Sequence, residues 1–190
     1  MGKRYTLDFF TQSFNTGKKT IETLFNDMEE EVFQASIQEG KWSSGEILDH
    51  INISSQLYLN QMHLGLPEDQ LSSLPKGPPP FRISPYWRLF IYIVSPENTF
   101  KTPTFPSFEP REASLLQKEE LITKALYIQD EFLNIVETAR EHELNLARVP
   151  MRNPEFNWLK MNVNVGLAII EAHQRRHFLQ IQAIKDSRTS

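Results

Sequence analysis

The sequence predicts an all-α protein, an up-down bundle of four long helices with a short extra helix and a long proline-rich connection. Three observations lead to this fold class. Apolar residues recur at spacings of three and four in four long stretches, which is typical of amphipathic helices. The alternating apolar and polar runs expected of strands do not occur. Ten of the twelve prolines fall between residues 66 and 110, so that segment interrupts the helical pattern.

Length and composition limit the kind of protein this can be. The 190 residues suffice for one domain with a sizeable core, and without an internal repeat we assign residues 1–190 to a single domain. A formal net charge of −4 provides no broad basic surface, which argues against a nucleic-acid partner. The absence of cysteine excludes disulfides, thiolate nucleophiles and cysteine-ligated zinc.

The sequence also predicts the location of the protein in the cell. The first residues carry no apolar run behind their basic positions and do not read as a signal peptide. The most apolar window, residues 86–94, is too short to cross a bilayer. We therefore expect a cytoplasmic protein that has no membrane partner.

The first predicted helical region covers residues 5–38. Its apolar pattern pauses at Gly17, where the helix can bend or divide, and Gly40 is expected to end it.

The second helix has a clear start. Ser43 is followed three residues later by Glu46, which is the pattern of a capping box. The helix is predicted to run to Leu64, with Gly65 as its stop.

The proline-rich connection contains one short predicted helix, which starts at Ser84-Pro85 and runs through Val94. Residues 96–110 then form a loop rich in phenylalanine and proline. A long connection of this kind is often functional, as a lid or a binding loop. It can equally serve as a packing strap or a dimer contact, and the sequence favours none of these readings.

The second half of the chain carries two more long helices. One is expected over residues 112–141 and the other over residues 159–185. Residues 144–156 connect them. The polar tail, residues 186–190, is expected to fray.

Three histidines fall on the apolar stripes of two of these helices. His173 and His177 are four residues apart, so they lie one turn above each other on the inward face of the last helix. His50 lies on the inward stripe of the second helix. A buried imidazole without a partner is costly, so these side chains form either a hydrogen-bonded core group or a metal site.

Other ionisable residues near these positions are interpreted differently. Arg175 and Arg176 lie off the inward stripe and are predicted to point towards water. His63 lies near a helix end without an inward placement. His142 follows the end of the helix at residues 112–141, where a cation is favoured by the helix dipole.

Two motifs resemble one known family. Residues 41–50, KWSSGEILDH, look like the helix-2 motif of the DinB-like (YfiT-like) four-helix-bundle superfamily. Residues 171–181, EAHQRRHFLQI, resemble its closing His-x-x-x-His motif. Motif order, spacing and chain length agree over nearly the whole protein. In that family the three matching histidines bind a divalent metal, so the resemblance implies His50, His173 and His177 as ligands.

The resemblance also implies a range of activities. Members of the family include metal-dependent hydrolases and S-transferases that act with low-molecular-weight thiols, and homodimers are common. We accordingly expect a homodimer that acts on a small-molecule substrate. Residues 75–110 have no clear counterpart in the family pattern, so the identity of the substrate does not carry over.

Our first hypothesis is a metal-dependent enzyme whose three histidines leave a fourth position open for water or substrate. Glu46, one turn before His50, is the candidate general base, and Asp49 is a weaker one. Nothing resembles the His-Glu-x-x-His motif of zinc peptidases. Three asparagines can supply hydrogen bonds around the site: Asn52, Asn162 and Asn164.

The metal cannot be read from three imidazoles, which suit Zn, Ni, Cu, Fe or Co; we expect Zn or Ni first, then Fe, Mn or Co. The alternative hypothesis is a non-catalytic stress-response or binding protein in which the metal stabilises the bundle. In a third reading the histidines hold no metal and form a polar core cluster.

Overall fold

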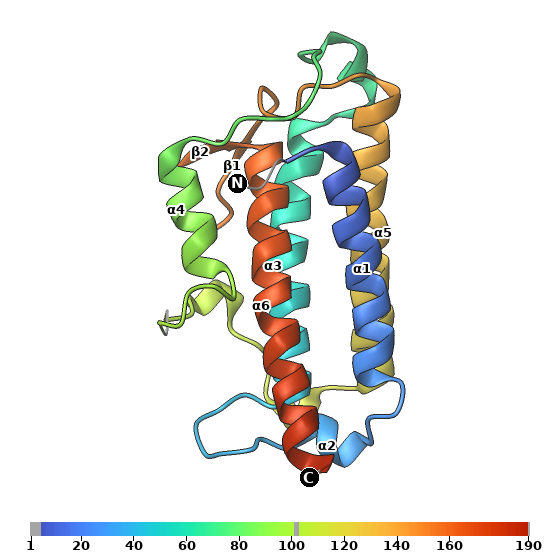
Figure 1. Cartoon of the computed structure of the whole chain (residues 1–190), viewed down its shortest axis with the longest axis vertical. Coiled ribbons are helices and arrows are strands. Elements are labelled where there is room, and N and C mark those ends of the chain that lie inside the picture. Colours follow the sequence, from blue (N-terminus) through green and yellow to red (C-terminus); the bar gives the residue numbers. More distant parts are fainter. Residues whose placement is uncertain (1–4, 101–102, 190) are drawn as a thin grey trace.

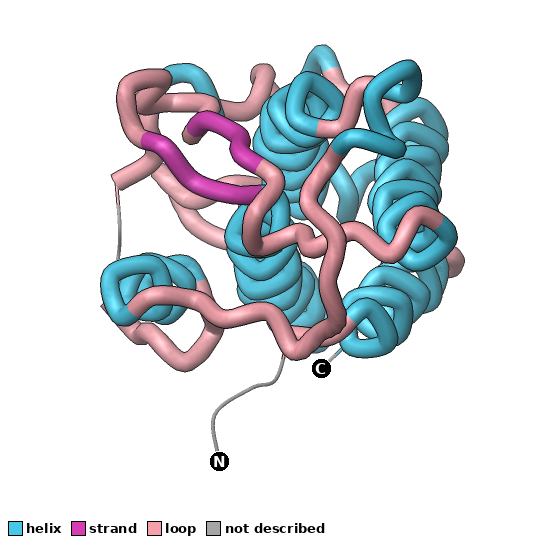
Figure 2. The backbone as a smooth tube through the Cα atoms, turned by 90° about the horizontal axis from the view of Figure 1, so that it is seen from above, coloured by secondary structure: helices cyan, strands magenta, loops and turns pink. Residues whose placement is uncertain are grey.

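The computed structural model describes residues 5–100 and 103–189 and confirms the all-α class (Figure 1). Four long helices form a bundle: α1 (Leu7–Phe25), α3 (Ser44–Gly65), α5 (Lys118–Glu141) and α6 (Val163–Thr189). α1 and α3 lie diagonally opposite each other, and each packs against both α5 and α6. A shorter helix, α4 (Pro85–Val94), packs against α6 and stands outside the bundle when the molecule is viewed from above (Figure 2).

The long helices do not alternate strictly in direction, which corrects the predicted up-down order. α3 runs parallel to α5: Asn52 donates to the carbonyl of Leu121, and further along both helices His63 pairs with Glu131. The reason is the long connection between α3 and α5, which returns the chain to the end of the bundle where α3 began (Figure 1). α6 is antiparallel to α3, as the predicted site requires.

The N-terminal region departs from the single predicted helix. α1 is unbroken through Gly17, where a Cβ atom would lie 2.7 Å from Oε1 of Gln129. This glycine therefore allows α1 and α5 to approach each other and does not divide the helix. After α1 comes a short helix, α2 (Glu30–Gln34). Gly40, with φ of 72°, belongs to a later turn and does not end a helix.

The capping box at the start of α3 is confirmed. The backbone N–H of Glu46 donates to Oγ of Ser43 at 3.1 Å, and the backbone N–H of Ser43 donates to the Glu46 carboxylate at 2.7 Å. The helix ends at Gly65, as predicted. A Cβ atom there would lie 2.6 Å from the carbonyl oxygen of Pro150, so the close approach of this loop requires glycine.

The connection between α3 and α5 is mostly irregular, and α4 is the one α-helix among its described residues. Three short 3₁₀ helices punctuate it: η1 (Glu68–Ser73), η2 (Pro106–Phe108) and η3 (Ala113–Leu115). α5 begins at Lys118, six residues after the predicted start at residue 112, because η3 and two extended residues, Leu116 and Gln117, intervene.

A small hairpin between α5 and α6 was not predicted. β1 (Pro150–Arg152) pairs antiparallel with β2 (Lys160–Asn162), with Met151 opposite Met161. Strands of three residues are too short to show a readable alternation. β2 also displaces the start of the last helix from residue 159 to Val163.

The end of α6 also differs from its prediction. The helix continues to Thr189, so residues 186–189 are helical where fraying was expected, and residue 190 lies outside the described part. Lys185 bonds to the carbonyl oxygens of Thr23 and Leu24, which ties this end to α1. None of the described helices is long and apolar enough to cross a bilayer.

The core divides into two apolar clusters along the bundle. On α6 the first cluster extends to Ala172 and the second begins at Phe178. His173 and His177 fall between them. Gln174 lies in the same layer, and its amide donates to Oγ of Ser55 on α3. The histidines therefore occupy a polar layer between two apolar halves.

Candidate metal centre

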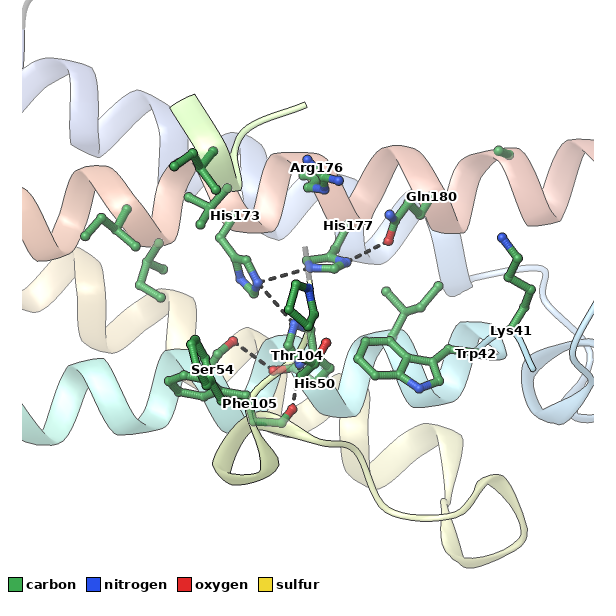
Figure 3. A pocket seen from close by; sticks show the side chains of 18 of the residues that line it. Lys41, Trp42, His50, Ser54, Thr104, Phe105, His173, Arg176, His177 and Gln180 are labelled. Atoms are coloured by element: carbon green, nitrogen blue, oxygen red, sulfur yellow. Dashed lines mark hydrogen bonds between the residues drawn. The ribbon is translucent and has the colours of Figure 1, made fainter. Parts of the chain in front are cut away.

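Three histidines from two helices meet at one point of the bundle (Figure 3). Because α3 and α6 are antiparallel, His50 lies at the level of His173 and His177. Nε2 of His173 is 3.1 Å from Nε2 of His50 and 3.0 Å from Nε2 of His177. The three sequence-predicted ligands are thus brought together, with their ligand atoms within 4.8 Å of one another.

The outer nitrogens of two of these rings are committed to hydrogen bonds. Nδ1 of His50 lies 2.6 Å from the carbonyl oxygen of Phe108, and Nδ1 of His177 lies 2.7 Å from Oε1 of Gln180. Both oxygens only accept, so each Nδ1 carries the proton and donates it. In the neutral rings, both Nε2 atoms then present lone pairs to the centre. A hydrogen bond to the far nitrogen is also how proteins orient histidine ligands.

His173 completes the group in a different way. Its Nδ1 is buried and has no hydrogen-bond partner within the described structure. Its Nε2 faces two lone pairs, and a single proton there cannot form two good hydrogen bonds at once. A divalent cation bound by three neutral imidazoles removes this conflict, so the donor set fits a transition metal.

The surroundings hold all three rings neutral. Burial lowers the pKa of His50, although the Phe108 carbonyl and Asp49 act in the opposite direction. Burial, followed by the other two histidines and Arg176, sets the pKa of His173 well below its ordinary value. Burial and the neighbouring His50 lower the pKa of His177 to about 3. At neutral pH the rings are therefore unprotonated, which is the form that binds metal.

The cluster lies in the wall of a pocket of about 760 Å³. α3, α4, α6 and the two loops at residues 37–42 and 103–108 form its walls. Trp42 contacts His50 with ring centroids 4.9 Å apart. Among the readings left open for residues 96–110, this geometry supports a binding loop: Pro103, Thr104 and Phe105 line the pocket.

The two arginines after His173 do not point simply to water, which corrects the prediction for both. Arg175 pairs with Glu171 at 3.1 Å and with Glu97 at 2.9 Å. Arg176 lines the pocket, and its guanidinium donates to three backbone carbonyls after α4, those of Ser95, Asn98 and Phe100. Apart from Glu171, which lies one turn earlier on α6, the partners come from the residues after α4, whose position the sequence pattern did not reveal.

Asp49 supports the loop that holds His50. Its side chain is 1% exposed and receives three hydrogen bonds from Arg111, from the backbone N–H, Nε and Nη2. Arg111 lies three residues after Phe108, whose carbonyl accepts the His50 proton. The pair therefore fixes the loop, and the loop fixes the tautomer of His50. Both carboxylate oxygens of Asp49 therefore accept hydrogen bonds from Arg111.

Glu46, the candidate general base, is placed by the capping box. One of its carboxylate oxygens accepts from Ser43, and Glu46 is not among the residues that line the pocket. Its role as a base stays a prediction.

The three asparagines also lie outside the pocket lining. Asn52 donates to the carbonyl of Leu121, and Asn162 accepts from the N–H of Val165 at the start of α6. Asn164 is buried, and its side-chain amide has no partner among the described residues.

The capping and base roles of Glu46 can be separated by two substitutions. Glutamine also serves at this position of a capping box, whereas alanine does not. Glu46→Ala is expected to lower the free energy of unfolding by about 1 kcal/mol, measured by urea denaturation, and Glu46→Gln is expected to leave it nearly unchanged. An activity lost in the stable glutamine variant identifies the carboxylate as the base; an activity retained there rules that role out.

Sequence reasoning missed three groups that orient the site. Gln180 was within reach of the helical pattern, because it follows His177 by three residues on the same face. Neither the Phe108 carbonyl nor Arg111 carries a signal in sequence, because a backbone oxygen is present at every residue and Arg111 lies 62 positions from its partner Asp49.

Comparison with known proteins agrees with the fold and with this arrangement. The family model of the DinB superfamily matches residues 14–181, a span that includes all three histidines. The chain belongs to the DinB superfamily. The searches of curated proteins and of solved structures gave no match.

Proposed function

We propose that this protein is a divalent-metal-dependent enzyme that works through His50, His173 and His177. One observation carries the proposal. Three neutral imidazoles converge in the wall of a 760 Å³ pocket, and no carboxylate or fourth histidine of the described chain joins them. A structural metal is usually enclosed by four protein ligands, whereas a catalytic one keeps a position open to its substrate. The pocket therefore supports the enzyme over the structural alternative.

The residues around the cluster favour thiol transfer over hydrolysis. A divalent cation at such a site lowers the pKa of a thiol or a water molecule that binds it. Hydrolysis also calls for a group that takes a proton from the attacking water, most often a carboxylate or a free histidine. No aspartate or glutamate lines the pocket, and the three histidines are all assigned as ligands. A thiol bound to a divalent cation would lose its proton outright to the solvent, so thiol transfer does not depend on a protein base. S-transfer is therefore the activity we propose first and hydrolysis the second.

The chain's own residues would position the reactants. Phe108 and Gln180 hold two of the imidazoles in the metal-binding tautomer. Thr104 lines the pocket and offers a hydroxyl group to a bound molecule. Ser54 also lines it, but its hydroxyl donates to the carbonyl oxygen of His50 and can only accept from a ligand. The apolar remainder of the lining excludes water from the reacting groups.

The test is a reconstitution experiment with tag-free protein. Metal is removed with EDTA, and Zn²⁺ or Ni²⁺ is then added back to one equivalent, with the content measured by mass spectrometry. Each sample is assayed for the transfer of cysteine or glutathione to an electrophilic dye and for hydrolysis of an aryl ester. We expect thiol transfer in the reconstituted sample alone. Metal-loaded protein that catalyses neither reaction would contradict the proposal, and ester hydrolysis alone would favour the second candidate.

Homodimer formation and a cytoplasmic location remain predictions from the sequence. Analytical ultracentrifugation of the same samples tests the first of them.

A further inference from the structure

The charged groups of the pocket are all of one sign. Lys41 and Arg176 line it, and none of the lining residues is an aspartate or a glutamate. A cleft whose walls carry one sign of charge concentrates ligands of the opposite sign. The pocket therefore selects for anions, whether or not a cation is bound at the histidines.

Three carboxylates close to the pocket, those of Asp49, Glu97 and Glu171, do not cancel this charge, because each is paired outside the wall. Asp49 is held by Arg111, and both Glu97 and Glu171 are held by Arg175. Neither arginine belongs to the pocket lining. These acidic groups are neutralised locally, so the positive charge inside the pocket stands without an acidic partner.

Arg176 lies on α6 beside His177 and, after burial and the neighbouring histidines, influences the pKa of both His173 and His177. Its guanidinium donates to the carbonyl oxygens of Ser95, Asn98 and Phe100 and forms no ion pair with any described carboxylate. Carbonyl dipoles offset part of its charge but leave the net charge in place. The hydrogen bonds hold the guanidinium in a fixed position, so a bound anion meets a preorganised cation.

The rest of the lining is mostly apolar, and the pocket is elongated. Along α6 it extends from Ile169 to Ile184, about 22 Å at 1.5 Å per residue. The histidines lie between the two ends (Figure 3). We call the end walled by α4 and the start of α6 the α4 arm, lined by Phe90, Ile93, Val94, Ile169 and Ile170. The opposite end, the Trp42 arm, is lined by Ile37, Trp42, Ile47, Ala183 and Ile184.

We propose that this pocket takes an elongated apolar molecule with one anionic group, such as a carboxylate. The anion lies between Arg176 and the histidines, and the apolar chain fills the α4 arm. If the proposed enzyme function holds, this molecule is its substrate, and only that statement rests on the proposed function. The binding of such a ligand does not depend on it. Apolar walls with a few convergent polar groups are the usual composition of a small-molecule site.

Three probes that share one chain and differ in the head group test the charge selection. Octanoate, octanol and octylamine are titrated by calorimetry into EDTA-treated and Zn²⁺-loaded protein. We expect octanoate to bind at least about tenfold tighter than octanol, because a charge-assisted hydrogen bond replaces a neutral one, and octylamine to bind weakest. Equal affinity for all three, or no binding of octanoate, overturns the proposal.

Two pairs of variants locate the ligand. Ile93→Trp narrows the α4 arm and is expected to weaken octanoate binding at least about tenfold, because several methylene groups of the ligand lose their burial. Ala183→Trp, in the Trp42 arm, is expected to leave octanoate binding unchanged. Arg176→Gln should reduce the ratio of octanoate to octanol affinity. Arg152→Gln should retain it, because Arg152 also donates to a backbone carbonyl but lies outside the pocket lining. If loss of Arg176 only loosened the segment after α4, the affinities for octanoate and octanol would fall together. A change in their ratio therefore reports the loss of the charge.

The metal content of every sample separates this inference from the proposed function. If octanoate is preferred by a protein that binds no metal, the ligand class stands and the metal-dependent function fails. If the protein binds metal and does not discriminate among the probes, the ligand class fails and the function stands.

Discussion

His173→Ala is expected to abolish stoichiometric metal binding and to weaken the remaining metal affinity by more than about 100-fold. Loss of a group that only hydrogen-bonds a ligand already lowers metal affinity about 10- to 100-fold, and His173 is itself a ligand. His173 is the central member of the cluster: its Nε2 lies 3.1 Å and 3.0 Å from the other two. Without it, two imidazoles remain on separate helices. Metal content by mass spectrometry and a competition titration with a chelating dye measure the loss. His50→Ala and His177→Ala should behave alike.

The control for this prediction is His63→Ala. His63 lies on α3, as His50 does, but it is exposed and pairs with Glu131. Its replacement should leave both metal content and affinity unchanged. Circular dichroism should show that the His173 variant keeps its helices, because apolar clusters on both sides of the polar layer hold the bundle. Full metal content in all three site variants would refute the assignment.

Arg111→Met is expected to destabilise the fold by about 3 kcal/mol, because a buried carboxylate then loses its partner. Asp49 is 1% exposed, and three hydrogen bonds from Arg111 reach its two oxygens. One of these, from the backbone N–H, survives the substitution. The loop that carries Phe108 should also loosen, and with it the acceptor for His50, so metal affinity should fall about tenfold. Urea denaturation and metal titration measure the two effects.

Substitutions of the two partners of this ion pair should lower the stability of the fold by different amounts. The Arg111 side chain is 45% exposed and can turn to water, so Asp49→Asn should cost less than Arg111→Met. Arg140→Met is the matched control. Arg140 pairs with exposed Asp8 and Glu137, and an exposed ion pair is worth about 1 kcal/mol or less. If Arg111→Met proves no more damaging than Arg140→Met, Asp49 does not depend on its arginine.

Much of the fold was readable from local pattern. The capping box at Ser43 and Glu46 was predicted and is present with both of its hydrogen bonds. The apolar periodicity also located α3, α5 and α6 to within six residues at either end. Such features are readable because a cap and an amphipathic stripe depend on neighbours within one or two helical turns.

The histidine site was readable for a related reason. The spacing of four between His173 and His177 places them on one face of any helix. His50 lies on the inward stripe of α3, and the resemblance of both motifs to one family joined the two helices. Periodicity alone could not show that their levels coincide; that depends on the antiparallel packing of α3 on α6.

The sequence by itself thus determined the long helices, their buried faces and the inward placement of the three histidines, because these follow from short-range spacing. Tertiary structure alone decided the parallel course of α3 and α5, the pairing of Asp49 with Arg111, and the position of Arg176 against the carbonyls after α4. All of these depend on the path of the connection between α3 and α5. That path is set by contacts between residues far apart in the chain, for which periodicity carries no signal.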